Sequence, residues 1–173
     1  VEPLCQGAAG MKMYGSGFLQ RIAAACRDAG VLLIADEVAM GFYRTGTRFA
    51  FDHAGIRPDI VCVGKALSAG TLPISAAAVD RAIFETFRDH PLDNTFYHGH
   101  TFAGNPLAAA AANTALDLYE EMDLPDLVHS RNQAIQKALT SLEPIRARHL
   151  GLIMAAEVPD PQRVAKALLN SGI

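Results

Sequence analysis

Short apolar runs alternate with longer stretches of helical period along most of the chain. The runs 31–35, 59–63 and 74–79 are typical of short strands, and we expect 31–35 to be buried on both faces of a parallel sheet. Apolar positions recur at helical spacing after each of these runs and also before the first of them. We therefore expect helices that begin near Ser16, Asp80, Asn105, Pro125 and Pro161.

Cap residues mark the limits of several of these helices. Ser16 is a suitable N-cap and Gly30 a suitable stop for the first helix. Asn105 followed by Pro106 combines a favoured N-cap with the residue favoured at the first helical position. The helix after Pro125 uses apolar residues as far as Leu142, and the last one is expected over 161–169. Residues 40–58 contain several glycines, and we expect mostly loop there with one short helix.

Strands that alternate with helices predict an α/β fold with a largely parallel sheet. A further apolar run over 150–158 predicts a strand in a second, smaller unit. We therefore expect a boundary near residue 125, with residues 1–125 in a large domain and residues 126–173 in a linking helix and an incomplete small domain.

Composition narrows the class of protein. With 173 residues, 50% apolar and 19% charged, the chain has the composition of a folded domain, and its formal net charge of −3 does not favour a nucleic-acid or membrane surface. Cys5, Cys26 and Cys62 lack metal-type spacing, which favours a reducing, cytoplasmic compartment. The chain begins at Val1 rather than Met and stops within a Ser-Gly-Ile phrase, so we expect it to be a piece of a longer protein.

Two charged residues stand at the ends of predicted strands. Asp36 ends the strand 31–35, and Lys65 follows the strand 59–63. Ligands of open α/β sheets bind beyond the carboxyl ends of the strands, so both side chains could face one crevice. Small residues surround the lysine in GKALSAG, which would let a flat ligand approach the backbone. The alternative is a buried ion pair between Asp36 and Lys65.

Three ordered motifs resemble the class III pyridoxal-phosphate aminotransferases, which have the fold type I architecture. They are ADEVAMGFYRTG, PDIVCVGKALSAG and HGHTFAGNPLAAAAANTAL. The resemblance implies pyridoxal 5′-phosphate as cofactor, residues 1–125 as part of the cofactor-binding large domain, and residues 126–173 as the start of the small C-terminal domain.

The resemblance also assigns roles to individual residues. Asp36 would meet the protonated pyridine nitrogen, and Val38 would lie against one face of the ring. Lys65 would bind the cofactor covalently and then move a proton on the substrate, so Asp36 and Lys65 are the expected catalytic pair. Glu37 points the other way on a strand, and we expect a structural pairing, for which Arg44 is a candidate.

The segment His98-Gly99-His100-Thr101 has two interpretations. As residues alone, His98 and His100 with His53 could bind a metal, and with Asp36 they could serve a metal-dependent hydrolase. By resemblance, Thr101 and the backbone of His100 would bind the cofactor phosphate, often in the site of a partner subunit, and Gly99 would line the substrate pocket. The second interpretation implies a homodimer and no metal.

Within the family, the opening VEPLCQGAAGMKMY and the HGHTFAGNPLA motif are similar to the members that act in biotin synthesis. That similarity implies transfer of an amino group from S-adenosylmethionine to 8-amino-7-oxononanoate, which gives 7,8-diaminononanoate. The alternatives are another ω-amino-acid or diamine aminotransferase and a non-catalytic fragment. We expect the 173 residues alone to turn over poorly, because family elements that grip the phosphate and the substrate carboxylate are absent from them.

Overall fold

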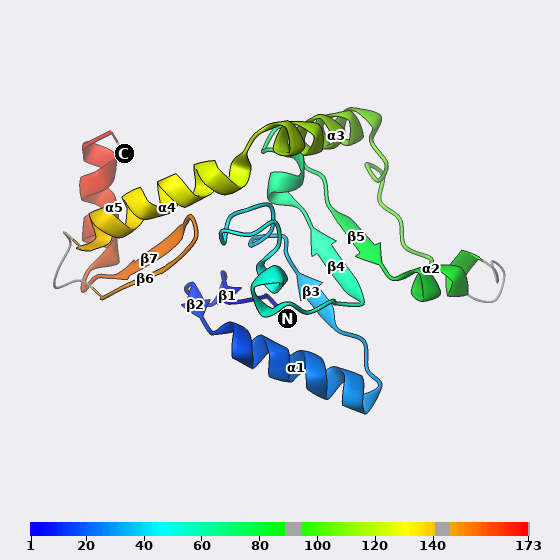
Figure 1. The fold of residues 1–173 in the computed structure, drawn as a ribbon. Helices are drawn as coiled ribbons and strands as arrows, with labels where there is room; N and C mark the ends of the chain where they lie inside the picture. The colour runs from blue at the N-terminus through cyan, green and yellow to red at the C-terminus, as the bar shows by residue number, and fades with distance from the viewer. Residues whose placement is uncertain (89–94, 141–145, 173) are drawn as a thin grey trace.

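The computed structural model describes residues 1–88, 95–140 and 146–172 (Figure 1). Its strands are β1 (Cys5–Gln6), β2 (Lys12–Met13), β3 (Ile34–Asp36), β4 (Ile60–Val63), β5 (Ala76–Val79), β6 (Arg146–Leu150) and β7 (Ile153–Glu157). Its α-helices are α1 (Ser16–Ala29), α2 (Arg81–Arg88), α3 (Pro106–Glu121), α4 (Leu124–Thr140) and α5 (Pro161–Asn170), and the short 3-10 helices are η1 (Ala50–Ala54) and η2 (Lys65–Ser68). Strands and helices alternate through the first part of the chain, which confirms the predicted α/β class.

A three-stranded sheet with the order β3-β4-β5 lies at the centre of the first part. β3 and β4 are parallel, with Asp36 opposite Cys62, whereas β5 runs antiparallel to β4. The parallel pairing predicted for the first two strands is therefore found, and the third strand adds an antiparallel edge. Since β3 and β4 are parallel, their carboxyl ends meet at the same edge of the sheet.

The expectation of a strand buried on both faces over 31–35 is wrong. Leu33 and Ala35 are buried, but Val31 and Leu32 are more than half exposed. The strand itself begins only at Ile34, because the N–H group of Leu33 donates to the side chain of Asp59. β3 is the edge strand of the described sheet, so the described chain covers it incompletely.

The free edge of β3 is paired with the first residue of the chain. The terminal amino group of Val1 donates to the carbonyl oxygen of Ile34 at 2.8 Å, and the N–H group of Asp36 donates to the carbonyl oxygen of Val1 at 2.7 Å. This is the hydrogen-bond pattern of a parallel ladder, reduced to a single residue. It holds the carboxyl end of β3 from the side opposite β4.

Local cap signals predicted the helix ends well. The side chain of Asn105 accepts hydrogen bonds from the N–H groups of Leu107 and Ala108, with Pro106 at the first helical position of α3. Gly30 adopts a left-handed conformation, with φ of 64°, and ends α1 as predicted. The N-cap of α1 is Gly15 rather than Ser16, a shift of one residue.

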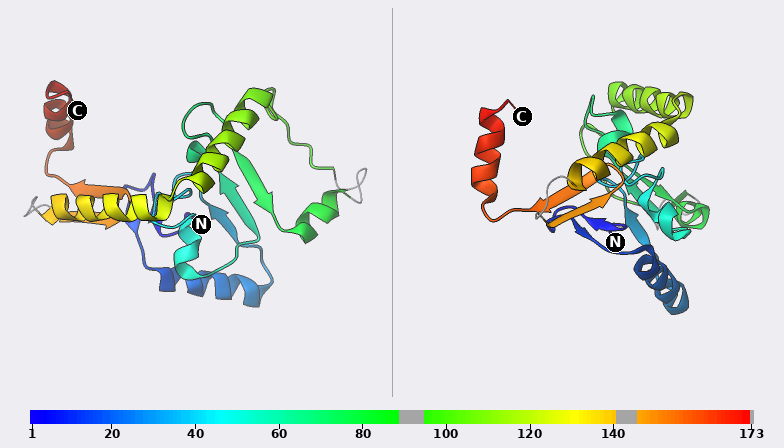
Figure 2. Two further views of the ribbon diagram at one scale, coloured as in Figure 1. Left: turned by 45° about the horizontal axis from the view of Figure 1, so that its top comes forward. Right: turned by 60° about the vertical axis from the view of Figure 1, so that its left-hand side comes forward.

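The last part of the chain forms a separate hairpin with flanking helices (Figure 2). β6 and β7 pair only with each other, and α4 connects α3 to this unit. β7 corresponds to the predicted strand over 150–158, whereas β6 was not predicted. The predicted end of α4 at Leu142 lies outside the described residues. Arg148 of β6 donates to the carbonyl oxygens of Gly10 and Met11, which joins the hairpin to the β1–β2 turn.

One cluster of buried side chains includes the last residue of β4. Val63, Leu67 and Ala112 form its centre, and it therefore joins β4, η2 and α3. Partly buried apolar side chains surround it, namely Phe42, Phe49, Val61, Ile74 and Leu116. The turn that follows β3 and the turn that follows β4 consequently rest on the same core. Among the described residues, no helix is both long enough and apolar enough to cross a membrane.

Candidate active site

Asp36 ends β3 with an exposed side chain. Its Oδ1 atom accepts a hydrogen bond from the N–H group of Val38 at 3.1 Å, two residues further along the turn. The sequence suggested a charge buried at the end of a strand, and this part of the expectation is wrong. The carboxylate is instead open to an external partner, and its bond to Val38 fixes its orientation at the edge of the sheet.

Glu37 is the carboxylate that is buried. Its side chain is fully inaccessible, and its two oxygens accept from the N–H groups of Ala50 and Phe51 at 3.0 and 2.9 Å. Burial raises the pKa of Glu37 to about 6, although both hydrogen bonds act in the opposite direction. The structural role expected for Glu37 is therefore found, but its partner is the first turn of η1 and not Arg44.

The bonds of Glu37 shape the turn that carries Asp36. They close the loop between β3 and η1, because a residue directly after the strand holds backbone groups 13 and 14 positions later. An orphan N–H group at a helix start is satisfied by a carboxylate in the same way. These bonds hold the turn that follows β3, which begins directly after Asp36 and contains Val38.

Lys65 follows β4 as the first residue of η2, and its side chain is exposed. Its φ of 46° lies in the left-handed region, which costs a non-glycine residue roughly 1–2 kcal/mol. The buried neighbours Gly64, Leu67 and Ser68 hold this conformation, and the hydroxyl of Ser68 donates to the carbonyl oxygen of Leu72 at 2.6 Å. Backbone strain of this kind often marks a residue whose position matters for function.

The structure brings the Asp36 turn and the Lys65 turn together. A Cβ atom built on Gly64 would lie 3.4 Å from Cγ1 of Val38, so the side chain of Val38 lies close to the residue directly before the lysine. No ion pair joins Asp36 to Lys65 within the described ranges 1–88, 95–140 and 146–172. The predicted alternative of a buried ion pair is therefore wrong. A carboxylate and an amine at one edge of the sheet are both free to meet a ligand.

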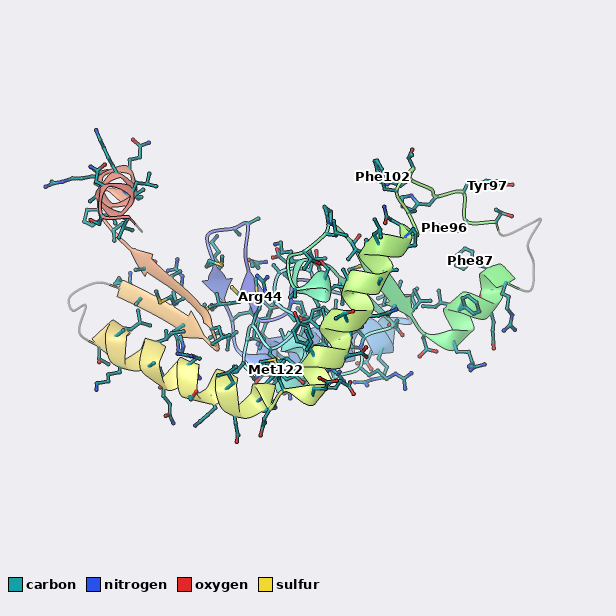
Figure 3. All side chains as sticks on the ribbon, turned by 90° about the horizontal axis from the view of Figure 1, so that it is seen from above. Arg44, Phe87, Phe96, Tyr97, Phe102 and Met122 are labelled. Atoms are coloured by element: carbon teal, nitrogen blue, oxygen red, sulfur yellow. The ribbon has the colours of Figure 1, made fainter. Side chains whose placement is uncertain are left out.

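The segment 98–101 belongs to the arm between α2 and α3. All of its residues are exposed, and the bonds described for it are local: Nδ1 of His100 accepts from the N–H group of Phe102 at 3.1 Å. In Figure 3 the labelled Phe96, Tyr97 and Phe102 lie on the arm between α2 and α3, apart from Arg44. The predicted phosphate and substrate residues Gly99, His100 and Thr101 are thus not hydrogen-bonded to Asp36 or Lys65 within one chain, as far as the described residues show.

The same geometry bears on the metal interpretation. His53 donates from Nε2 to the carbonyl oxygen of Thr45 at 3.0 Å, which leaves it engaged in the turn after β3. Within the part of the chain that the structure describes, no three His, Cys, Asp or Glu side chains are grouped so that they could hold a metal ion. The described residues therefore offer no support for a hydrolase centred on His98, His100 and Asp36.

One contact to the lysine turn was not foreseen from the sequence. The hydroxyl of Tyr119 on α3 donates to the carbonyl oxygen of Ala66 at 2.7 Å. The two residues are 53 positions apart, and the sequence around Tyr119 does not indicate which residue its hydroxyl contacts. The contact is formed because α3 packs on η2.

The family profile of the class III aminotransferases matches residues 1–173, the whole chain. The chain belongs to the class III aminotransferase family. Members of this family depend on pyridoxal phosphate. The predicted family and fold type are therefore confirmed.

Individual relatives agree with this assignment. The adenosylmethionine-8-amino-7-oxononanoate aminotransferase of Synechococcus elongatus is 51% identical over 118 residues, which are 68% of this chain and 28% of that protein. The crystal structure of the enzyme with the same name from Methanocaldococcus jannaschii matches with a TM-score of 0.90 and 33% identity, over 100% of this chain and 45% of that one.

A second solved structure comes from a differently named enzyme. The ornithine aminotransferase of Toxoplasma gondii, with pyridoxal phosphate at partial occupancy in its active site, matches with a TM-score of 0.84 and 37% identity, over 100% of this chain and 41% of that one. The chain thus spans less than half the length of the relatives it matches.

The residues of the site fit pyridoxal phosphate. The cofactor requires an amine for its aldehyde and an anion for its ring nitrogen, and when bound it supplies an electron sink for the carbon next to the amino group. Lys65 and Asp36 provide an exposed amine and an exposed carboxylate at the ends of adjacent parallel strands. Gly64, directly before the lysine, is buried and has no side chain, and Val38 lies close to the position that a Cβ atom there would occupy.

Proposed function

We propose that this chain carries the catalytic lysine and its acidic partner for a pyridoxal-phosphate-dependent amino transfer. The single observation that supports this most strongly is the edge of the β3–β4 pair. There an exposed carboxylate and an exposed, conformationally strained lysine stand at neighbouring strand ends without forming an ion pair. In a purely structural pair of this kind, the two charges would be expected to meet.

Each residue has a distinct part in the proposed reaction. Asp36 keeps the ring nitrogen protonated, since a carboxylate stabilises an adjacent cation. Lys65 holds the cofactor covalently at rest and, once released by the substrate, moves the proton at the substrate carbon. Val38, whose side chain lies near Gly64, provides an apolar contact for one face of the ring.

We propose S-adenosylmethionine as amino donor and 8-amino-7-oxononanoate as acceptor, with 7,8-diaminononanoate as product. The support is the naming of the Synechococcus and Methanocaldococcus relatives. The second candidate is an ω-amino acid or diamine as donor, which the similarity to the ornithine aminotransferase of Toxoplasma favours. The reaction would serve biotin synthesis in the first case. The three free cysteines are in keeping with a cytoplasmic enzyme.

A homodimer is the assembly that the geometry supports best. Gly99, His100 and Thr101 are exposed and share no described hydrogen bond with Asp36 or Lys65 of their own chain, so we propose that they serve the site of a second subunit. There the hydroxyl of Thr101 and the N–H group of His100 would bind the phosphate. The division at residue 125 remains our proposal for the large and small domains, and the separate β6–β7 strand pairing supports it.

Formation of pyridoxamine phosphate tests the function directly. The 173-residue chain and a version extended at both ends are incubated with pyridoxal phosphate and either S-adenosylmethionine or ornithine, and pyridoxamine phosphate is quantified by chromatography. We expect product from the extended protein with S-adenosylmethionine, little from the short chain, and none from Lys65→Ala. Product from ornithine alone would favour the second candidate, and equal product from Lys65→Ala would refute the proposal.

A further inference from the structure

We infer that Tyr119 is a positioning residue, which holds the turn of Lys65 so that the amine projects into the site. This inference rests on the proposed function, because it assigns Tyr119 a role in the reactivity of Lys65. The decisive contact is the hydrogen bond from the hydroxyl of Tyr119 to the carbonyl oxygen of Ala66, at 2.7 Å. Ala66 is the residue directly after the lysine.

The lysine turn needs an external restraint. Lys65 has a φ of 46° and Ala69 a φ of 50°, so both ends of η2 are held by non-glycine residues in the left-handed region. Such conformations persist only where the surroundings determine them. Within the turn, the backbone bonds run from Leu67 to Gly64 and from Ala69 to Ala66. The bond from Tyr119 is the side-chain contact that ties the carbonyl group of this strained turn to a different element.

α3 is well placed to act as the support. It packs against η2, and the cluster of Val63, Leu67 and Ala112 fixes the two elements relative to each other. Tyr119 lies seven positions after Ala112, on the same face of the helix. Its hydroxyl therefore reaches the turn from a rigid element and not from a loop.

Tyr119 also contacts the other half of the site. Its ring lies 5.8 Å from that of Phe42, which belongs to the turn that follows Asp36 and itself has a φ of 56°. One side chain thus touches both turns, the one that carries Asp36 and the one that carries Lys65. Burial raises the pKa of the Tyr119 phenol, so the hydroxyl stays protonated and remains a donor at neutral and moderately alkaline pH.

The variant Tyr119→Phe removes the hydroxyl and keeps the ring beside Phe42. Tyr14→Phe is the matched control, because the hydroxyl of Tyr14 likewise donates to a backbone carbonyl, that of Glu2, at 2.6 Å, and both tyrosines are half-buried. Tyr14 contacts neither turn of the site in the bonds described for it. A loss of general stability would affect both variants, whereas a loss of positioning would affect only Tyr119→Phe.

The readout is the selectivity of labelling. The extended protein is treated with pyridoxal phosphate and then borohydride between pH 6.5 and 9, at a temperature where circular dichroism shows all variants folded, and the label on Lys65 is divided by that on Lys12, Lys137 and Lys166. We expect Tyr119→Phe to lower this ratio by roughly 2- to 10-fold, the range that corresponds to one lost hydrogen bond, and Tyr14→Phe to leave it unchanged.

The outcomes separate the inference from the function on which it rests. If Tyr119→Phe keeps the wild-type ratio at every pH, the positioning role is wrong and the proposed function stands. If both variants lower the ratio equally, the effect is one of stability and the inference is again wrong. A wild-type protein without preference for Lys65 would overturn both the inference and the proposed function.

Discussion

Replacement of Glu37 by Gln tests the buried carboxylate that shapes the site. In the folded protein the pKa of Glu37 is raised from 4.5 to about 6 by burial. The acid form is therefore favoured in the folded state, and the stability that it contributes is fully present below pH 4.5 and is lost as the pH rises through 6. A shift of about 1.5 units corresponds to roughly 2 kcal/mol of unfolding free energy.

The amide of Glu37→Gln cannot titrate and offers one acceptor where two N–H groups, those of Ala50 and Phe51, need one each. At pH 4.5 the wild-type side chain is itself mostly protonated and resembles the amide, so we expect the two proteins to be close in stability there. Because only the wild type loses the contribution of the acid form, the stability of the variant relative to the wild type should rise by about 2 kcal/mol by pH 7.5.

Urea denaturation followed by circular dichroism at several pH values between 4.5 and 7.5 measures the difference. Glu120→Gln is the matched control, because Glu120 is exposed and pairs with Arg48 at the surface, where an ion pair contributes at most about 1 kcal/mol. A difference between Glu37→Gln and the wild type that stays constant across the pH range would show that the carboxylate does not titrate as a buried group, and would refute the reasoning.

Three further substitutions have defined outcomes. Gly151→Ala should lower the melting temperature markedly, since Gly151 has a φ of 60° and an added Cβ atom would lie 2.2 Å from the backbone of Thr45. An unchanged melting curve would show that the β6–β7 hairpin does not pack against Thr45. Asn105→Ala should lower the free energy of unfolding, measured by urea denaturation, by about 1 kcal/mol, because two N–H groups of α3 lose their acceptor. An unaltered urea midpoint would show that Asn105 does not stabilise α3 as an N-cap. Asp36→Asn should keep pyridoxal phosphate bound, as judged by absorbance after gel filtration, but form pyridoxamine phosphate at least about tenfold more slowly; a wild-type rate would remove the pyridinium role.

Local signals in the sequence were sufficient wherever a residue acts on its own neighbours. The cap of α3 by Asn105 and the stop of α1 at Gly30 depend on residues within one turn, and both are found as predicted. Asp36 and Lys65 were recognised because apolar runs lead directly into them, and the order of the strands then places both at one edge.

Predictions that depend on distant partners were less accurate. Val31 and Leu32 are exposed and precede β3, whose late start and edge position no periodicity reveals. Glu37 was assigned Arg44 as a partner from charge alone, whereas the fold offers it two backbone N–H groups of η1. β6 was missed because its residues, Arg146 to Leu150, are largely polar and form a strand only by pairing with β7.

The site of covalent attachment tests the central claim most directly. The chain contains four lysines, Lys12, Lys65, Lys137 and Lys166, so labelling without a specific site would be spread among four peptides. After treatment with pyridoxal phosphate and borohydride, the protein is digested and the labelled peptides are quantified by mass spectrometry, with Lys65→Ala as the comparison. We predict that the label lies on the Lys65 peptide and that the variant is left with only background labelling. An even distribution over the four peptides, or an undiminished total in Lys65→Ala, would contradict the assignment of Lys65 and with it the proposed chemistry of the site.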